Sequence, residues 1–208
     1  QARRNEWNQA ETLMRWARHL SLGSDELILK QANLYYGLAS QTALAERATF
    51  FEQARTRLDE VERINPWRVE TFLMRAQLYQ EHRERIGPAG DDAIDAAYRQ
   101  ALILNPRHYV ARFLYARFVM ARGDLGRTRE VLEAGTRYLY PDDDRIVPYL
   151  AFTAAFRELT GDYGGALALY RRVGNYVVLR SGERSFDAEW KENLQLRKSI
   201  HELMRSQR

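Results

Sequence analysis

Apolar side chains recur every three or four positions along most of this 208-residue chain. This spacing places them on one side of an α-helix, whereas a strand would show strict alternation. The pattern is densest from Tyr109 to Ala121, where only Arg112 and Arg117 interrupt it. It predicts an all-α protein with helices near residues 5–20, 25–38, 47–64, 68–84, 91–104, 108–122, 125–139, 146–159, 163–173 and 187–205.

Two kinds of helix breaker separate these segments and recur along the chain. Asn65-Pro66 returns as Asn105-Pro106, and Gly123-Asp124 returns as Gly161-Asp162. Proline cannot continue a helix interior, and glycine favours the turn that follows a helix. Each kind returns after about 38–40 residues. A period of this length indicates helix pairs that stack side by side around a continuous core.

The residues between these breakers resemble the tetratricopeptide repeat (TPR), a helix pair of roughly 34 residues with large and small residues at set places. Small residues allow paired helices to approach closely, and aromatic residues fill the space between pairs. The resemblance implies an α-solenoid, that is, a right-handed superhelix of helix pairs. The matching residues are Phe72, Ala76, Tyr79, Tyr98, Ala101, Pro106, Ala116, Gly123, Asp124, Leu125, Ala154, Gly161, Asp162, Tyr163, Ala166 and Tyr170.

Several positions depart from the TPR pattern. Arg112 stands where the repeat carries a large apolar residue, and Thr128 replaces a small alanine. Additional residues lie around 38–46, 85–90 and 142–148. These departures leave the local angle between helices open, but they preserve the expected fold class.

The spacing divides the chain into a repeat array over residues 1–173 and a C-terminal segment over residues 174–208. Segment 1–22 matches only the second helix of a repeat, so we expect the native protein to continue upstream of Gln1. Four further repeats are expected at about 24–66, 68–106, 108–141 and 146–173.

The C-terminal segment begins where the helical pattern is interrupted. Residues 174–186 predict an irregular linker with a short extended stretch at 176–179. From Asp187 to Arg208, apolar residues gather on one side, as in a helix that caps the last repeat. A basic amphipathic helix for a membrane surface is the alternative, but glutamates at 189, 192 and 202 disfavour it.

Composition excludes several classes of protein. Apolar residues make up 45% of the chain, enough for a continuous core that a disordered protein lacks. The absence of cysteine excludes disulfides and cysteine-ligated zinc. No apolar run approaches the roughly 18 residues of a membrane span. The net charge of +4 comes mainly from arginines interleaved with acidic residues, which indicates solvated helix faces rather than a nucleic-acid surface.

The sequence shows no catalytic or metal-binding pattern. The histidines at 19, 82, 108 and 201 lack a second ligand at metal spacing, and His82 and His108 fall at helix ends, where solvated or capping roles are expected. The acidic run at 142–144 is expected to cap a helix, and Gly161–Gly165 lacks the lysine of a phosphate loop. We therefore expect no enzyme, no cofactor, no metal site and no small-molecule substrate.

The TPR resemblance places partner binding on the first helices of the repeats, which line the concave side of a solenoid. Phe113 and Met120 would supply apolar contacts and Arg117 would bind a carboxylate, unless the helix from 110 to 120 is buried within the stack. The candidate residues are Leu29, Asn33, Tyr36, Leu73, Gln77, Gln80, Phe113, Arg117, Met120, Ala155 and Glu158.

Three functions remain open at this stage. The favoured one is a non-catalytic scaffold that binds a peptide or partner protein, as the soluble portion of a larger bacterial protein. The arginine-rich repeats also resemble the soluble C-terminal regions of bacterial membrane O-antigen ligases and glycan polymerases. That resemblance implies an accessory periplasmic domain beside the membrane-embedded part of the same polypeptide. The third function is an arginine-mediated binder of nucleic acid or of an anionic surface.

The sequence does not identify the compartment or the oligomeric state. The ligase resemblance favours the periplasm over the cytoplasm. Repeat ends with uncovered apolar faces would also allow a homodimer.

Overall fold

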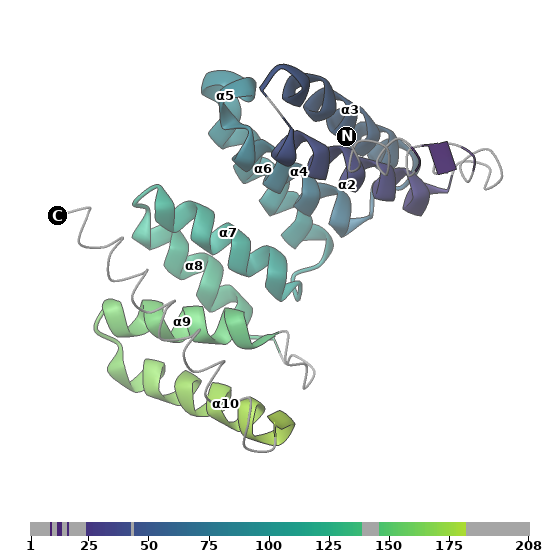
Figure 1. The fold of residues 1–208 in the computed structure, drawn as a ribbon. Helices are drawn as coiled ribbons and strands as arrows, with labels where there is room; N and C mark the ends of the chain where they lie inside the picture. Colours follow the sequence, from purple (N-terminus) through teal and green to yellow (C-terminus); the bar gives the residue numbers. More distant parts are fainter. Residues whose placement is uncertain are drawn as a thin grey trace. The chain divides into compact units, whose positions relative to one another are not determined.

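The computed structural model describes residues 24–42, 44–138 and 146–181, together with Gln9, Thr12, Leu13 and Trp16. This part of the chain consists of helices and turns and contains no strand, so the predicted all-α fold is confirmed (Figure 1). The long helices are α2 (Asp25–Gln41), α3 (Leu44–Ile64), α4 (Val69–Glu81), α6 (Gly90–Leu104), α7 (Tyr109–Ala121), α8 (Leu125–Thr136), α9 (Val147–Leu159) and α10 (Tyr163–Ser181). A short helix, α5 (Arg83–Ile86), and a 3-10 turn, η1 (Gly87–Ala89), precede α6.

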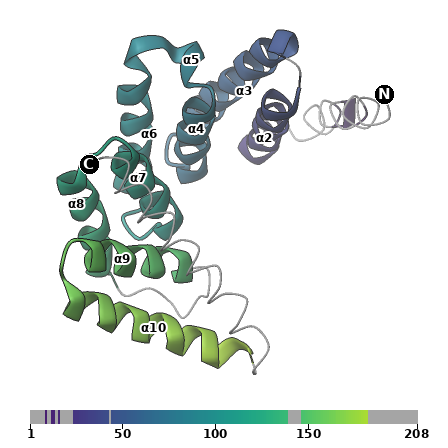
Figure 2. The same cartoon turned by 60° about the vertical axis from the view of Figure 1, so that its left-hand side comes forward.

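Contacts between helices divide the chain into two units, residues 1–105 and residues 106–208. In unit 1, α2 packs against α3 and α4 packs against α6; in unit 2, α7 packs against α8 and α9 packs against α10. Figures 1 and 2 show these helices as neighbouring antiparallel pairs. The described part of each unit therefore contains two helix hairpins.

The recurring Gly-Asp pairs form the turns within the hairpins of unit 2. Gly123 has a φ of 80° and Gly161 a φ of 85°, a left-handed conformation that glycine adopts without steric cost. The following aspartates, Asp124 and Asp162, each accept a hydrogen bond from the backbone N–H three residues later, at 2.8 and 2.9 Å. Each glycine thus ends a first helix, and each aspartate starts the second helix of the same pair.

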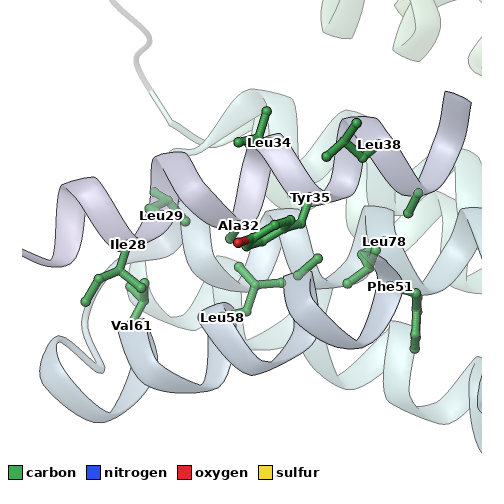
Figure 3. Packing of buried hydrophobic residues seen from close by; sticks show 12 residues of the cluster. Ile28, Leu29, Ala32, Leu34, Tyr35, Leu38, Phe51, Leu58, Val61 and Leu78 are labelled. Atoms are coloured by element: carbon green, nitrogen blue, oxygen red, sulfur yellow. The ribbon is translucent and has the colours of Figure 1, made fainter. Parts of the chain in front are cut away.

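One part of the core of unit 1 lies between α2, α3 and α4 (Figure 3). Ile28, Ala32 and Tyr35 point from one side of α2 toward Leu58 of α3, and Leu78 of α4 is fully buried beside them. These positions in α2 are three or four residues apart, as the periodicity predicted. Full burial of a leucine or isoleucine side chain contributes about 1.5–3 kcal/mol, so this stripe holds the hairpin together.

In unit 2, α9 is buried on all sides. Every residue from Tyr149 to Phe156 is at most 4% exposed. The Tyr149 hydroxyl donates a hydrogen bond of 2.7 Å to the carbonyl oxygen of Leu132 on α8, so its polar end is satisfied. Helix α9 also packs against α7 and α10 and forms the centre of the unit.

Arg112, which departs from the TPR pattern, is buried at 4% exposure within unit 2. Its guanidinium group donates to the carbonyl oxygens of Val131 at 2.8 Å and Pro106 at 2.6 Å, and it lies 5.8 Å from the ring centre of Tyr138. Thr128, the other departure, is fully buried and donates its hydroxyl to the carbonyl oxygen of Asp124. Both residues therefore fill the core, and the terminal nitrogens of Arg112 and the hydroxyl of Thr128 bond to backbone carbonyls.

The structure corrects several predicted boundaries. Helix α10 continues through Ser181, so the predicted extended stretch at 176–179 is wrong, as is the irregular linker over residues 174–181. One glycine, Gly174, costs a helix only about 1 kcal/mol, and apolar residues continue at four-residue spacing through positions 169, 173 and 177. The additional residues near 85–90 form α5 and η1, where Gly87 has a φ of 73°.

The remaining boundaries shift by a few residues. Helix α2 extends to Gln41 rather than 38, α3 begins at Leu44 rather than 47, and α8 ends at Thr136 rather than 139. Apart from the four residues named above, the predicted incomplete repeat over 1–22 lies outside the described residues, as do the acidic turn at 142–144 and the terminal helix over 187–205. In the described part, no helix combines the length and hydrophobicity needed to span a membrane.

Candidate partner-binding surface

The first helices of consecutive hairpins contact each other within each unit: α2 contacts α4 in unit 1, and α7 contacts α9 in unit 2. We use the name first-helix surface for a set of exposed or half-exposed side chains on these helices, centred on the predicted binding residues. In unit 1 it consists of Asn33, Tyr36, Ser40, Leu73, Gln77, Gln80 and Glu81, and in unit 2 of Val110, Phe113, Arg117 and Glu158.

A polar bridge joins α2 to α4 on the first-helix surface of unit 1. The hydroxyl groups of Tyr36 and Ser40, one turn apart on α2, both donate hydrogen bonds to the carboxylate of Glu81, the one from Ser40 at 2.7 Å. Tyr98 of α6 donates to the side-chain oxygen of Gln80 at 3.1 Å. These bonds hold Glu81 and Gln80 in place at the end of α4.

Glu81 and Ser40 were not among the predicted binding residues. Glu81 lies four positions after Gln77, a spacing that places both on one face of a helix. Helical spacing from Gln77 was therefore the signal that could have identified it.

The hydroxyl of Tyr36 stays protonated in this bridge. Burial is the main cause that raises the pKa of Tyr36 well above its ordinary value of 10.0, and the hydrogen bond to the Glu81 carboxylate is the second cause. Tyr36 therefore remains a hydrogen-bond donor at neutral pH.

The other predicted residues of unit 1 differ in exposure. Asn33 and Gln80 are exposed, and Leu73 and Gln77 are half-buried. Leu29 is only 8% exposed and belongs to the core of the α2–α3 hairpin. Of the predicted set in this unit, only Leu29 is therefore a core residue.

In unit 2, Phe113 is half-buried and Arg117 is exposed on α7. The Phe113 ring meets the ring of Phe152 edge-on at 5.4 Å, and the exposed Arg117 guanidinium lies 5.4 Å from the centre of the Phe113 ring. Met120 is 5% exposed and Ala155 is 3% exposed, so both are core residues. Most of the 110–120 helix is thus buried, and its exposed or half-exposed residues are Val110, Phe113, Leu114 and Arg117.

Two charges on these surfaces have no charged partner in the described part of the chain. Arg117 makes the ring contact with Phe113 but no ion pair there, and Glu81 accepts hydroxyl hydrogen bonds but meets no cation. Glu158 is half-buried and accepts a hydrogen bond of 2.9 Å from the hydroxyl of Tyr170, whereas Glu81 and Arg117 are exposed. Arg117 and Glu81 are therefore the charges best placed to pair with a partner.

Of the two described histidines, His108 caps a helix and His82 is buried. His108 caps α7, because its Nδ1 accepts the backbone N–H of Ala111 at 3.1 Å, as expected for a helix end. His82 follows α4 but is only 2% exposed, so the expected solvated role is wrong; its ring lies 5.6 Å from that of Phe51. Among the described residues, no group of three or more potential ligands could hold a metal ion.

No protein-family model matches the chain, and no curated protein matches it. Among solved structures, the chain is similar to a crystal structure described as a thermophilic TPR protein of Thermus thermophilus. The sequences are 15% identical, the match covers 96% of this chain and 91% of that one, and the TM-score is 0.55. The comparisons give no support to the resemblance to O-antigen ligases. An identity this low shows the fold alone, and the fold is that of a TPR-like helical repeat.

Proposed function

We propose that this protein is a non-catalytic interaction module that binds a segment of a partner protein on its first-helix surfaces. The observation that carries this proposal is the presence, in each unit, of two adjoining first helices that present a positioned charge without a charged partner in the described part of the chain. Stacked helix pairs offer extended surfaces of this kind, which suit binding better than chemistry.

In unit 1, Glu81 would pair with a lysine or arginine of the partner. Its carboxylate is already oriented by Tyr36 and Ser40, so a cation would meet it at little cost in side-chain entropy. The amide side chains of Asn33 and Gln77 can donate to and accept from the backbone of an extended segment. This surface therefore suits a basic, extended peptide.

In unit 2, Arg117 would pair with a carboxylate of the partner, while Phe113 supplies an adjoining apolar contact. The half-buried phenylalanine is held by Phe152, so its exposed edge is rigid. A rigid aromatic ring beside an arginine is a common centre of binding energy at protein interfaces. This surface suits an acidic residue flanked by an apolar one.

Charge-reversal variants test the proposal directly. Arg117→Glu and Glu81→Lys change exposed side chains, so helicity measured by circular dichroism is expected to stay unchanged. Each variant is expected to reduce capture of the partner by about tenfold, because one charge-assisted contact becomes a repulsion. Capture is quantified by mass spectrometry after affinity purification from a cell lysate.

Arg137→Glu is the matched control, since Arg137 is exposed directly after α8 and lies off the first-helix surface. Proteins that bind the first-helix surfaces are retained by this variant and lost by the other two. Capture of the same proteins in equal amounts by all three variants would contradict the proposal.

Several described arginines pair with acidic residues, which does not favour the alternative that the protein binds nucleic acid. Arg55 pairs with Glu52 at 2.7 Å, Arg99 with Asp95 at 2.7 Å and Arg127 with Glu130 at 3.0 Å. Ion pairs of this kind neutralise these three arginines locally, which does not favour a basic stripe for phosphates.

A further inference from the structure

The carboxylate of Glu81, on the first-helix surface of unit 1, is held at both of its oxygen atoms. Tyr36 donates its hydroxyl to the Oε1 atom, and Ser40 donates its hydroxyl to the Oε2 atom at 2.7 Å. The terminal torsion of a glutamate side chain otherwise turns over a broad range. Because the two hydrogen bonds go to different oxygens, they oppose this rotation and set the plane of the carboxylate before a partner arrives.

Each oxygen of Glu81 can still accept one further hydrogen bond. A carboxylate has about four acceptor positions, two on each oxygen, and the two hydroxyl groups use one position on each. Glu81 is exposed, and no cation pairs with it within the described ranges. The open acceptor positions are therefore shared between the two oxygens rather than gathered on one.

Arginine and lysine would use such a carboxylate differently. The guanidinium group is planar and presents two parallel N–H groups, which bond to both oxygens of one carboxylate. The ammonium group of lysine is a compact charge on a flexible stem, so it gains little from a carboxylate whose plane is already set. An acceptor that is held in one plane and open at both oxygens therefore matches a guanidinium group better than an ammonium group.

We propose that the first-helix surface of unit 1 selects arginine over lysine in the partner segment. This inference rests on the proposed function, because it assigns the partner residue that pairs with Glu81. Tyr36 and Ser40 are positioning residues in this assignment, since they act through the orientation of the Glu81 carboxylate. The partner is thus a peptide segment whose arginine forms a two-point contact with Glu81.

Selection from a phage-displayed library of random peptides tests this assignment, with the full 208-residue chain as the bait. The peptides of interest bind the wild type and are lost with Glu81→Gln, which keeps the size of the side chain and removes its charge. Among them, arginine is expected to be enriched over lysine by at least about threefold relative to the unselected library. Replacing the arginine of such a peptide by lysine is expected to weaken its binding about fivefold in fluorescence polarisation, because one of two hydrogen bonds is lost.

Three variants test the positioning role from the side of the protein. Tyr36→Phe and Ser40→Ala each release one oxygen of Glu81 and keep its charge. Each is expected to reduce the preference for the arginine peptide to about twofold or less, while the affinity for the lysine peptide changes by less than about twofold. Ser40→Thr keeps the hydroxyl group and is expected to retain the preference. A loss of stability alone would weaken both peptides equally, so the ratio of the two affinities separates positioning from a structural role.

The outcomes distinguish this inference from the proposed function on which it rests. Equal affinities of the arginine and lysine peptides for the wild type would overturn the selectivity and leave Glu81 as a binding residue. An unchanged preference in both Tyr36→Phe and Ser40→Ala would overturn the positioning mechanism in the same way. If no selected peptide depends on Glu81, the selectivity and the proposed role of this surface are both contradicted.

Discussion

At the residue scale, Gly135 lies in a part of unit 2 that leaves no space for a side chain. A Cβ atom at this position would meet the Tyr149 hydroxyl and the Cδ atom of Arg112, both of which are buried. Neither side chain can move easily, because each bonds to a backbone carbonyl of α8. Glycine is therefore required here by space rather than by backbone conformation.

We expect Gly135→Ala to lower the free energy of unfolding by about 1–3 kcal/mol, the usual cost of overpacking a core. Urea denaturation followed by circular dichroism measures this change. Gly126→Ala, on the same helix, is the control, because a Cβ there would meet only the Asp124 carboxylate at an ordinary 3.6 Å. The control is expected to be neutral or stabilising, and an equal loss in both variants would contradict the packing explanation.

His82 couples the stability of unit 1 to pH. Burial lowers the pKa of His82 below its ordinary value of 6.5, against the opposing effect of Glu84 and Glu81. A histidine whose pKa is depressed in the folded state binds its proton more readily when unfolded. The contribution of neutral His82 to the free energy of unfolding is therefore fully present above pH 6.5. It is lost as the pH falls from 6.5 toward the lower pKa of the folded state.

The expected result is a lower urea midpoint at about pH 5.5 than at about pH 7.5, with part of the difference absent in His82→Leu. Leucine has a similar size, stays uncharged, and can pack against Phe51 in place of the imidazole. An identical pH dependence in the wild type and the variant would show that His82 does not carry this effect.

At the scale of single elements, the starts of the second helices of unit 2 depend on aspartate caps. Asp124 accepts the Arg127 N–H with its side chain and the Thr128 hydroxyl with its backbone carbonyl, so the first turn of α8 is closed twice. Asp124→Ala removes only the first of these bonds and is expected to cost about 1 kcal/mol in thermal or urea unfolding. Asp124→Asn retains an acceptor, so a loss as large as that of the alanine variant would argue against capping.

Most of the elements could be predicted from the sequence because their ends carry specific chemistry. Asn65-Pro66 and Gly161-Asp162 mark helix ends by residues that cannot continue a helix or that cap the next one. The end of α10 could not be predicted, since Gly174 and the β-branched Val177 and Val178 read as a break. In the structure the helix continues through these weak helix formers to Ser181.

The exposure of the binding residues was harder to predict than their position. Met120 and Ala155 occupy first-helix positions of the repeat pattern, yet both are buried in unit 2. Their burial depends on the tertiary surroundings of α7 and α9, which a repeat pattern does not encode. Glu81 was missed for a related reason, since its importance comes from two hydroxyl groups on another helix.

At the scale of the whole molecule, each unit carries a first-helix surface of its own. The chain therefore offers two surfaces of different chemistry, one centred on the Glu81 carboxylate and one on the Arg117 guanidinium. Partner binding on these surfaces is the central claim of our account. It predicts that a bound partner lies against α2 and α4 and away from the exposed side of α3.

Site-specific photo-crosslinking tests this claim most directly. The photoreactive residue p-benzoylphenylalanine is placed at Asn33 or Gln77 on the first-helix surface, and at Thr49 or Thr56 on the exposed side of α3. We predict covalent adducts with the captured partner from positions 33 and 77 and none from positions 49 and 56. Adducts formed only from the α3 positions, or equally from all four, would contradict the account.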